Sequence, residues 1–318
     1  MMHLRIQQLE EACGALILNA LHDPEVTELM LNPDSVLWVE HRSKGMIPMG
    51  NISAGQAERI IRKVAGILNL EVNYDCPILE CVFPIDHSRF EGMLPPIVKN
   101  PSFSLRKKAS VVYTFEDYIK NEALTETQAR VIRHLMSERK NILISGGPGT
   151  GKTTFVNACI FELTRLMPAS ERLLILEDVP ELQCTAPNVL QLLTHKIIKY
   201  PVDLQKLVFV AMRARPDRII IGEVRDKAML DLLKAWNTGC PGGMATVHAN
   251  DTHATVERCL SLAEEAGVAK PISLLLETLH VIIALERNPL TLKRRVKNIS
   301  RLTGYDAVTA QFQFEELA

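Results

Sequence analysis

Apolar and polar positions in the first third of the chain alternate between helix-like and strand-like periods. Leu9–Leu21 has apolar residues at helical spacing and ends before Pro24, where proline prevents the helix from continuing. Ser53–Gln56 is a capping-box pattern, and it predicts a helix with one apolar face that runs to Leu68. Prolines punctuate the strand-like runs, so these strands are expected to be short or at sheet edges. The pattern predicts a small α+β domain over residues 1–108. The strand-like runs are Ser35–Glu40, Ile78–Pro84, Phe90–Leu94 and Ser102–Leu105.

The second half of the chain has nearly continuous apolar strands that are separated by amphipathic helices. Thr125–Gln128 is another capping-box pattern, and it opens a helix that leads to the apolar run Asn141–Ser145. Uninterrupted apolar strands are typical of a parallel sheet that is covered on both faces. The pattern therefore predicts an α/β domain over residues 125–318, joined to the first domain by a linker at residues 109–124. Ligands bind such sheets at the carboxyl ends of the strands. The further core strands are Leu173–Leu176, Ile219–Ile221 and Met244–Val247.

A glycine-rich segment, GGPGTGKTT, follows the strand Asn141–Ser145 and precedes a predicted helix. It fits the pattern G-x-x-x-x-G-K-[ST], and the strand–loop–helix context distinguishes a phosphate-binding loop from a helix N-cap loop with a chance lysine. Backbone N–H groups of such a loop converge on phosphate oxygens, while the lysine reaches the β- and γ-phosphates and the following hydroxyl ligates Mg²⁺. We therefore predict that the loop binds a nucleoside triphosphate. The predicted binding residues are Gly146, Gly147, Pro148, Gly149, Thr150, Gly151, Lys152, Thr153 and Thr154.

Two of the other core strands end in carboxylates. Glu177 and Asp178 follow the strand Leu173–Leu176, and Glu223 follows the strand Ile219–Ile221 after one glycine. A carboxylate at such a place can hold Mg²⁺ or orient the water that attacks the nucleotide. The alternatives are a solvated turn for the first pair and a solvent-facing acid for Glu223.

Three basic side chains are further candidates for contact with phosphate. His248 ends the strand Met244–Val247, where its imidazole can meet the γ-phosphate region or can be structural. Arg89 and Arg106 lie in the N-terminal domain, and a guanidinium forks onto phosphate oxygens, although surface arginines on strands are the alternative. The basic stretch Lys293–Arg301 lacks interleaved aromatic residues, which favours a solvated strand face over contact with nucleic acid.

Charge and composition limit the possible partners. The net charge of the 318 residues is −1, which gives no overall attraction to nucleic acid or to an acidic membrane. No apolar run approaches the roughly 20 residues that a membrane helix needs, and the N-terminus lacks the apolar segment of a secretory signal. The seven cysteines are scattered without a C-x-x-C pair, which favours reduced thiols in the cytoplasm. Direct nucleic-acid binding and an integral membrane segment are therefore not expected.

Four segments in sequence order resemble the secretion-ATPase superfamily that powers type II and type IV secretion and type IV pili. The glycine-rich loop, ILEDVPELQ, AMRARPDRIIIGEVRD and AWNTGCPGGMATVHAND are similar to the Walker A, Asp, Walker B and His boxes of that family. The segments LHDPEVTELMLNPDSVLWVE and MLPPIVKNPSFSLRK look like the N-terminal domain of the conjugal-transfer, TrbB-type branch. The resemblance covers nearly the whole chain. It implies a RecA-like P-loop NTPase core, a smaller N-terminal α+β domain, a homohexameric ring and a nucleotide that lies between the two domains.

The resemblance also implies roles for the residues of the core. Lys152 acts in catalysis, and Glu223 is the expected catalytic carboxylate, with Glu177 as its rival. Thr153, Glu177 and Glu223 are the expected ligands of Mg²⁺, and His248 matches the His-box histidine.

The resemblance also bears on two arginines of the N-terminal domain and on one cysteine of the core. Arg89 and Arg106 match the N-domain arginines that reach the γ-phosphate. Cys240 stands where the family usually has another histidine, so a role for that histidine does not carry over.

The function implied by the resemblance is that of a hexameric ATPase, which hydrolyses ATP with Mg²⁺ to power a type IV secretion or conjugative DNA transfer machinery. Such a protein is cytoplasmic, peripheral at the inner membrane, and meets components of the secretion or conjugation complex. One alternative is a motor for type IV pili or type II secretion, although the chain lacks the four-cysteine metal motif of the type II branch. Another is a DNA-stimulated RecA-like motor, since a shared fold does not fix function. A third is a scaffold that binds ATP and hardly hydrolyses it, against which the two carboxylates argue.

Overall fold

The computed structural model describes residues 2–108, 112–195, 200–288 and 291–318. The chain divides into two compact units, Met1–Ser110 and Val111–Ala318. The first unit has one hydrophobic core and the second has two.

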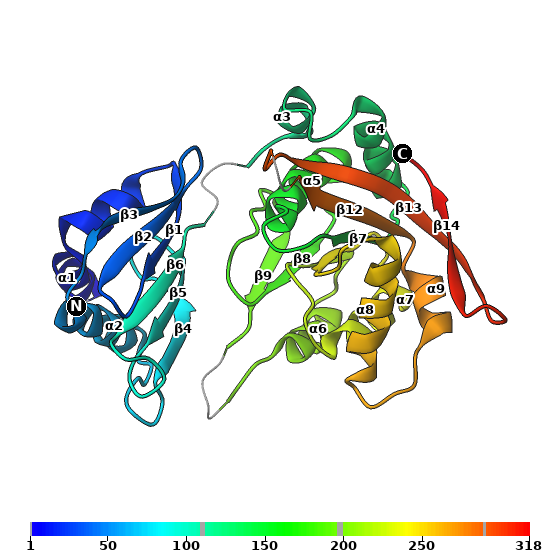
Figure 1. The fold of residues 1–318 in the computed structure, drawn as a ribbon. Helices are drawn as coiled ribbons and strands as arrows, with labels where there is room; N and C mark the ends of the chain where they lie inside the picture. Colours follow the sequence, from blue (N-terminus) through cyan, green and yellow to red (C-terminus); the bar gives the residue numbers. More distant parts are fainter. Residues whose placement is uncertain (1, 109–111, 196–199, 289–290) are drawn as a thin grey trace. The chain divides into compact units, whose positions relative to one another are not determined.

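The first unit is a six-stranded antiparallel sheet with two helices packed against it (Figure 1). The strand order is β3-β2-β1-β6-β5-β4. Leu29 and Val39 on neighbouring strands are fully buried, and they pack with Ile17 and Ile61 of the two helices. The alternation along Ser35–Glu40 thus places one face of the sheet in the core. The elements are α1 (Met2–His22), β1 (Val26–Leu31), β2 (Val36–His41), β3 (Gly45–Asn51), α2 (Ala54–Leu68), β4 (Ile78–Val82), β5 (Arg89–Met93) and β6 (Ser102–Arg106).

The capping box predicted at Ser53–Gln56 forms only in part. The Ser53 hydroxyl accepts a hydrogen bond from the Gln56 backbone N–H at 3.2 Å, which begins α2 as predicted. The Gln56 side chain instead donates to the carbonyls of Ala12 and Cys13 in α1. These carbonyls lie just before Gly14, where a φ of 69° interrupts α1. Gln56 therefore satisfies backbone groups at a kink that the helical periodicity did not predict.

Part of the predicted linker at residues 109–124 belongs to the second unit and is helical. Helix α3 (Phe115–Lys120) begins with a complete capping box between Thr114 and Asp117. Phe115 is fully buried, and its ring stacks on that of Phe155 with 6.0 Å between the centroids. The helix has only six residues, too few for periodicity to reveal it, and tertiary packing stabilises it. Residues 109–111 of the predicted linker lie outside the described residues.

The second unit contains an eight-stranded sheet with the order β14-β13-β12-β7-β11-β10-β8-β9. The strands from β12 to β9 in that order are parallel, whereas β13 and β14 extend the sheet antiparallel. The parallel core confirms the predicted α/β domain, and the antiparallel extension was not predicted. The elements after α3 are α4 (Glu126–Ser137), β7 (Ile142–Ser145), α5 (Lys152–Leu166), β8 (Leu173–Glu177), β9 (Val189–Leu193), α6 (Leu204–Arg213), β10 (Arg218–Ile221), α7 (Ala228–Asn237), β11 (Met244–Val247), α8 (Thr252–Glu264), α9 (Ile272–Thr278), β12 (Val281–Arg287), β13 (Arg294–Asp306) and β14 (Gln311–Glu316).

Helices cover both faces of this sheet, as the continuous apolar strands predicted (Figure 1). Successive residues of each central strand point to opposite faces, so Leu143 packs with α6 to α9 while Ile144 packs with α3, α4 and α5. Every residue of β7, β8, β10 and β11 is buried. The core strands therefore form a rigid base whose carboxyl edge carries the polar loops.

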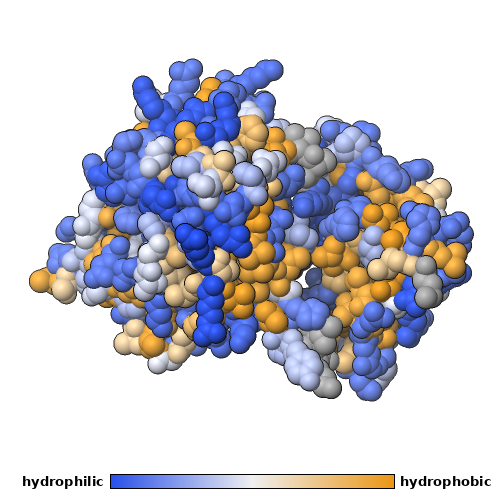
Figure 2. Space-filling view, turned by 180° about the vertical axis from the view of Figure 1, so that it is seen from behind, coloured by the Kyte–Doolittle hydropathy of each residue, from blue (hydrophilic) through white to orange (hydrophobic). Residues whose placement is uncertain are grey.

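Helix α6 is apolar on two faces. Leu207 and Val208 are buried in the core, whereas Phe209, Val210 and Met212 expose 51%, 41% and 40% of their surface. Figure 2 shows that hydrophilic residues dominate much of the visible molecular face and that apolar residues gather in patches between them. Exposed large apolar residues that gather on one helix are typical of a contact surface, so the outer side of α6 is suited to contact with another protein surface.

Asn141, immediately before β7, joins three segments at the amino edge of the sheet. Its side chain is 1% exposed, donates to the Thr278 carbonyl at 2.7 Å, and accepts from the N–H groups of Gly242 and Gly243 at 2.8 and 3.1 Å. We expect Asn141→Ala to lower the free energy of unfolding by about 2–4 kcal/mol, because it leaves buried backbone groups without partners. Denaturant unfolding of this variant and of the exposed control Asn237→Ala measures the difference, and equal stabilities would contradict the prediction.

Candidate functional site at the carboxyl edge of the sheet

The carboxyl ends of four adjacent strands bring together the polar residues predicted for the core. The glycine-rich loop follows β7, His248 follows β11, Glu223 follows β10 and Glu177 ends β8. Because these strands are parallel neighbours, residues separated by about a hundred positions in sequence meet at one edge.

The loop between β7 and α5 has a backbone that requires glycine. Gly149 and Gly151 have φ values of 71° and 90°, which L side chains rarely adopt. A Cβ at Gly146 would lie 2.5 Å from the Thr150 hydroxyl oxygen and 3.0 Å from the Leu285 carbonyl oxygen. Gly151 caps α5 without a side-chain hydrogen bond. The first turn of α5 therefore presents backbone N–H groups and a positive helix end to an anion.

Lys152 is buried within this loop and contacts His248. Its ammonium donates to the carbonyls of Gly146 and Gly147 at 2.8 and 3.2 Å and lies 3.0 Å from His248 Nδ1. An ammonium has only donors, so Nδ1 is the acceptor here and the ring proton of the neutral imidazole is on Nε2. The lysine is thus held at the mouth of the loop, where it can reach the terminal phosphates.

Glu223 lies on the other side of the imidazole. One carboxylate oxygen is 3.0 Å from His248 Nε2, and the other accepts from the Arg225 guanidinium at 2.8 Å. Burial raises the pKa of the Glu223 carboxyl, but the Arg225 hydrogen bond and the charges of Arg225, His248 and Lys152 outweigh burial and hold this pKa below its usual value. The residue is therefore ionised at neutral pH and available as a base or a metal ligand.

Glu177 has a different environment. Its side chain is buried, and one carboxylate oxygen accepts hydrogen bonds from the backbone N–H groups of Glu181 and Leu182 at 2.9 and 2.7 Å. These contacts close the loop that follows β8. The neighbouring Asp178 accepts from the Thr194 hydroxyl at 3.0 Å. The geometry favours a structural role for Glu177 and leaves Glu223 as the stronger catalytic candidate.

The donor set is compatible with Mg²⁺ that is shared with a nucleotide. The described residues contain no cluster of three or more His, Cys, Asp or Glu side chains that could hold a metal ion. Mg²⁺ is usually bound by one or two protein oxygens together with substrate phosphates and waters. Thr153, on the first turn of α5, and the ionised Glu223 offer that kind of incomplete set.

Arg89 and Arg106 lie directly opposite one another in the first unit, on the paired strands β5 and β6. Arg106 also faces Glu28 of β1, with 3.3 Å between its Nε and a carboxylate oxygen. Burial raises the pKa of Glu28, whereas the charges of Arg106 and Arg89 lower it in part. The sheet therefore joins the two predicted arginines into one cationic pair, and their contact with a nucleotide stays a prediction.

Sequence analysis did not identify four arginines around the glycine-rich loop. Arg225 clamps Glu223, and Arg294 donates to the Gly149 carbonyl at 2.8 Å. Arg287 borders the same loop from the end of β12, and Arg258 approaches it from α8. Arg294 belongs to the basic stretch Lys293–Arg301, for which the sequence favoured a solvated strand face. The basic composition of that stretch did not indicate that one of its arginines would contact the glycine-rich loop.

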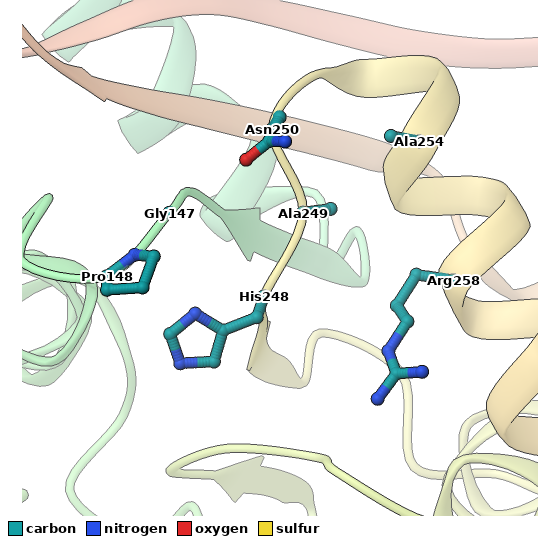
Figure 3. Close-up of a pocket in the computed structure, with 7 residues that line it drawn as sticks. All are labelled: Gly147, Pro148, His248, Ala249, Asn250, Ala254 and Arg258. Carbon is teal, nitrogen blue, oxygen red and sulfur yellow. The ribbon is translucent and has the colours of Figure 1, made fainter.

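Two cavities border the crest of the loop at Gly147 and Pro148. One, of about 290 Å³, extends toward His248 and Arg258, and the other, of about 390 Å³, extends toward Leu285 and Arg287. In Figure 3 the side chains of His248 and Arg258 approach the first cavity from β11 and α8. The loop thus has a cationic cavity on the side of β11, and a cavity on the side of β12 whose lining combines apolar residues with Glu286 and Arg287.

The titration of His248 offers a test of this geometry. Burial lowers the pKa of His248 below 6.5, the cations Lys152, Arg225 and Arg258 lower it further, and Glu223 opposes them. We therefore expect a neutral imidazole at pH 7 that gains its proton only as the pH falls below 6.5. In Glu223→Gln the pKa is expected to fall further, because the opposing negative charge is lost.

Proton NMR of the imidazole resonances, assigned with a His248→Gln variant, measures this titration. A pKa at or above 6.5 in the unsubstituted protein, or a higher pKa in Glu223→Gln, would show that these groups are not in contact.

The fold and the site together define a P-loop nucleotide-binding protein with a RecA-like core. The chain belongs to the type II/IV secretion system protein family, whose model matches residues 17–302. The chain is 44% identical to a probable conjugal transfer protein TrbB of Sinorhizobium fredii over 300 residues, covering 94% of this chain and 90% of the relative. It is 41% identical to the conjugal transfer protein TrbB of Rhizobium radiobacter, covering 94% and 91%.

Solved structures support the same fold. The ADP-bound pilus retraction motor PilT superposes with a TM-score of 0.63 at 17% identity, covering 92% of this chain and 83% of that protein. This likeness confirms the predicted combination of a RecA-like core and a smaller N-terminal domain. No helix within the described ranges is long and apolar enough to span a membrane.

Proposed function

We propose that this protein hydrolyses ATP to power a type IV secretion or conjugation machinery. The observation that carries the proposal is the row formed by Lys152, His248 and Glu223 at the mouth of a phosphate-binding loop. In phosphoryl transfer, charge develops on the terminal phosphate while water attacks. The Lys152 ammonium on one side of the imidazole can offset that charge, and the ionised Glu223 carboxylate on the other side can orient the water.

In the proposed reaction, the backbone N–H groups of residues 146–153 and the Lys152 ammonium hold the β- and γ-phosphates. Glu223 orients the attacking water and accepts its proton as the new oxygen–phosphorus bond forms. The bond between the γ-phosphorus and the bridging oxygen breaks, and that oxygen leaves with ADP. Thr153 and Glu223 would hold Mg²⁺, which would supply charge neutralisation at the phosphates when bound. His248 fixes the separation between lysine and carboxylate.

Assembly into a homohexamer that docks on inner-membrane components is part of the proposal. The relatives at 44% and 41% identity are conjugal transfer proteins, which favours the conjugation machinery over pilus retraction as the load. The exposed apolar residues of α6 offer a surface for contact between copies.

The proposal is tested by measuring phosphate release from ATP with Mg²⁺ and purified protein, alongside light scattering with and without nucleotide. Turnover by a species six times the mass of the chain is expected. Strong, salt-sensitive stimulation by DNA would instead favour a DNA motor. A protein that binds ATP without turnover would be a nucleotide-gated scaffold.

The arginine pair of the first unit gives a separate prediction. We expect Arg89→Ala to lower kcat by roughly tenfold or more with a smaller effect on nucleotide affinity, if its contact with the γ-phosphate strengthens in the transition state. Steady-state kinetics together with direct nucleotide binding separates the two effects. Arg62→Ala is the matched control, because Arg62 on α2 contacts Glu58 and the Val72 carbonyl, both in the first unit. Unchanged kcat in Arg89→Ala and Arg106→Ala would exclude the pair from the reaction.

A further inference from the structure

We infer that the cavity between the crest of the phosphate-binding loop and α8 is a site for inorganic phosphate, in which Arg258 is the principal ligand. The inference rests on the proposed ATP hydrolysis, because it assigns a place to one product of that reaction. It concerns residues that the phosphate-binding motif itself does not contain.

The cavity is contiguous with the loop and has a volume of about 290 Å³. Gly147 and Pro148 form one wall, His248 and Asn250 form another, and Arg258 closes the side toward α8 (Figure 3). The strand β11 and the helix α8 fix these walls, since the segment between them is only four residues long. A phosphate released at the loop could enter the cavity without crossing the bulk of the protein.

The electrostatics of the cavity select an anion. Arg258 contributes a guanidinium, Asn250 contributes a side-chain amide, and no carboxylate lines the walls. Among the residues that the structure describes, the Arg258 guanidinium has no hydrogen-bond or ion-pair partner. Glu257, which directly precedes Arg258, pairs with Lys270 at 3.1 Å, and Asp251 caps α8 by accepting from the Ala254 N–H at 2.7 Å. The guanidinium is therefore available to fork onto the oxygens of a phosphate.

Both nitrogens of His248 face groups outside the cavity, which determines how phosphate can be held. Nδ1 faces Lys152 and Nε2 faces Glu223, each at 3.0 Å, so the ring forms a wall and does not donate into the cavity. Glu223 is not among the residues that line the cavity. Arg258 and Asn250 then supply the donors, and the product is separated from the carboxylate that assists the attack.

Equilibrium dialysis with radiolabelled inorganic phosphate in the presence of saturating ADP tests the inference without requiring turnover. We expect Arg258→Gln to weaken phosphate binding by about tenfold or more while ADP affinity is unchanged, because charge-assisted contacts are lost. Arg258→Lys should restore part of the affinity. In the hydrolysis assay, Arg258→Gln should weaken product inhibition by phosphate to a similar extent as it weakens phosphate binding.

Arg301→Gln is the matched control, since Arg301 is an exposed arginine of β13 paired with Glu315 at 2.9 Å. Absence of phosphate binding by the unsubstituted protein, equal affinity in Arg258→Gln, or equal losses for phosphate and ADP would each overturn the inference. Loss of hydrolysis with intact phosphate dialysis would count against the proposed function alone.

Discussion

Replacement of Lys152 by alanine is expected to reduce ATP hydrolysis by about two to three orders of magnitude or more. The ammonium lies at the mouth of the loop, and its position is fixed by the carbonyls of Gly146 and Gly147. In the transition state it would offset charge on the transferring phosphoryl group, and the backbone N–H groups alone do not replace that charge. The loss is therefore expected mainly in kcat.

The measurement is steady-state phosphate release by Lys152→Ala, with thermal unfolding to verify that the variant is folded. Lys270→Ala is a suitable control, because Lys270 is an exposed lysine paired with Glu257 at 3.1 Å and lies outside the site. Full activity in Lys152→Ala would falsify the assignment of the loop as the catalytic phosphate site.

The second large effect distinguishes the two candidate carboxylates. Glu223→Gln is expected to lower kcat by about 10²–10⁴-fold and to leave nucleotide binding nearly intact, because the amide keeps the size of the side chain but cannot accept a proton from water. Glu177→Gln keeps an oxygen that can accept from the N–H groups of Glu181 and Leu182. We expect it to retain most of the activity.

Glu223→Gln and Glu177→Gln are compared in the same hydrolysis assay, and each isosteric variant is the control for the other. Glu177→Ala adds a further contrast, because it leaves two backbone N–H groups without their acceptor and is expected to destabilise the fold by about 1–3 kcal/mol. If Glu177→Gln lost activity and Glu223→Gln did not, the roles of the two carboxylates would be reversed.

The predictions that held depended on signals within short stretches of sequence. The apolar runs at Ile219–Ile221 and Met244–Val247 predicted buried parallel strands, and both are fully buried in the sheet. The glycine pattern predicted a loop whose φ values at Gly149 and Gly151 are positive. The capping box at Thr125 begins α4 as predicted. In each case the chemistry of neighbouring residues restricts the backbone directly.

The predictions that failed or were missing depended on distant contacts. Helix α3 is too short for periodicity and exists because Phe115 packs on Phe155. The Gln56 side chain left its capping box because carbonyls of a kinked helix 43 and 44 residues away accept its hydrogen bonds. The antiparallel strands β13 and β14 were not predicted, and their place in the sheet depends on the pairing of β13 with β12 and of β14 with β13.

The sequence by itself determined that a glycine-rich loop with the phosphate-binding pattern follows a buried strand, that carboxylates and a histidine end neighbouring strands, and that a smaller α+β domain precedes them. Tertiary structure decided which of these residues meet. The strand order β7-β11-β10-β8 places His248 between Lys152 and Glu223, and the loop after β8 takes up Glu177. Strand order and loop closure depend on contacts between residues far apart in the chain, so no local pattern encodes them. That is why one of two similar acids became a structural ligand of the backbone and the other remained available for chemistry.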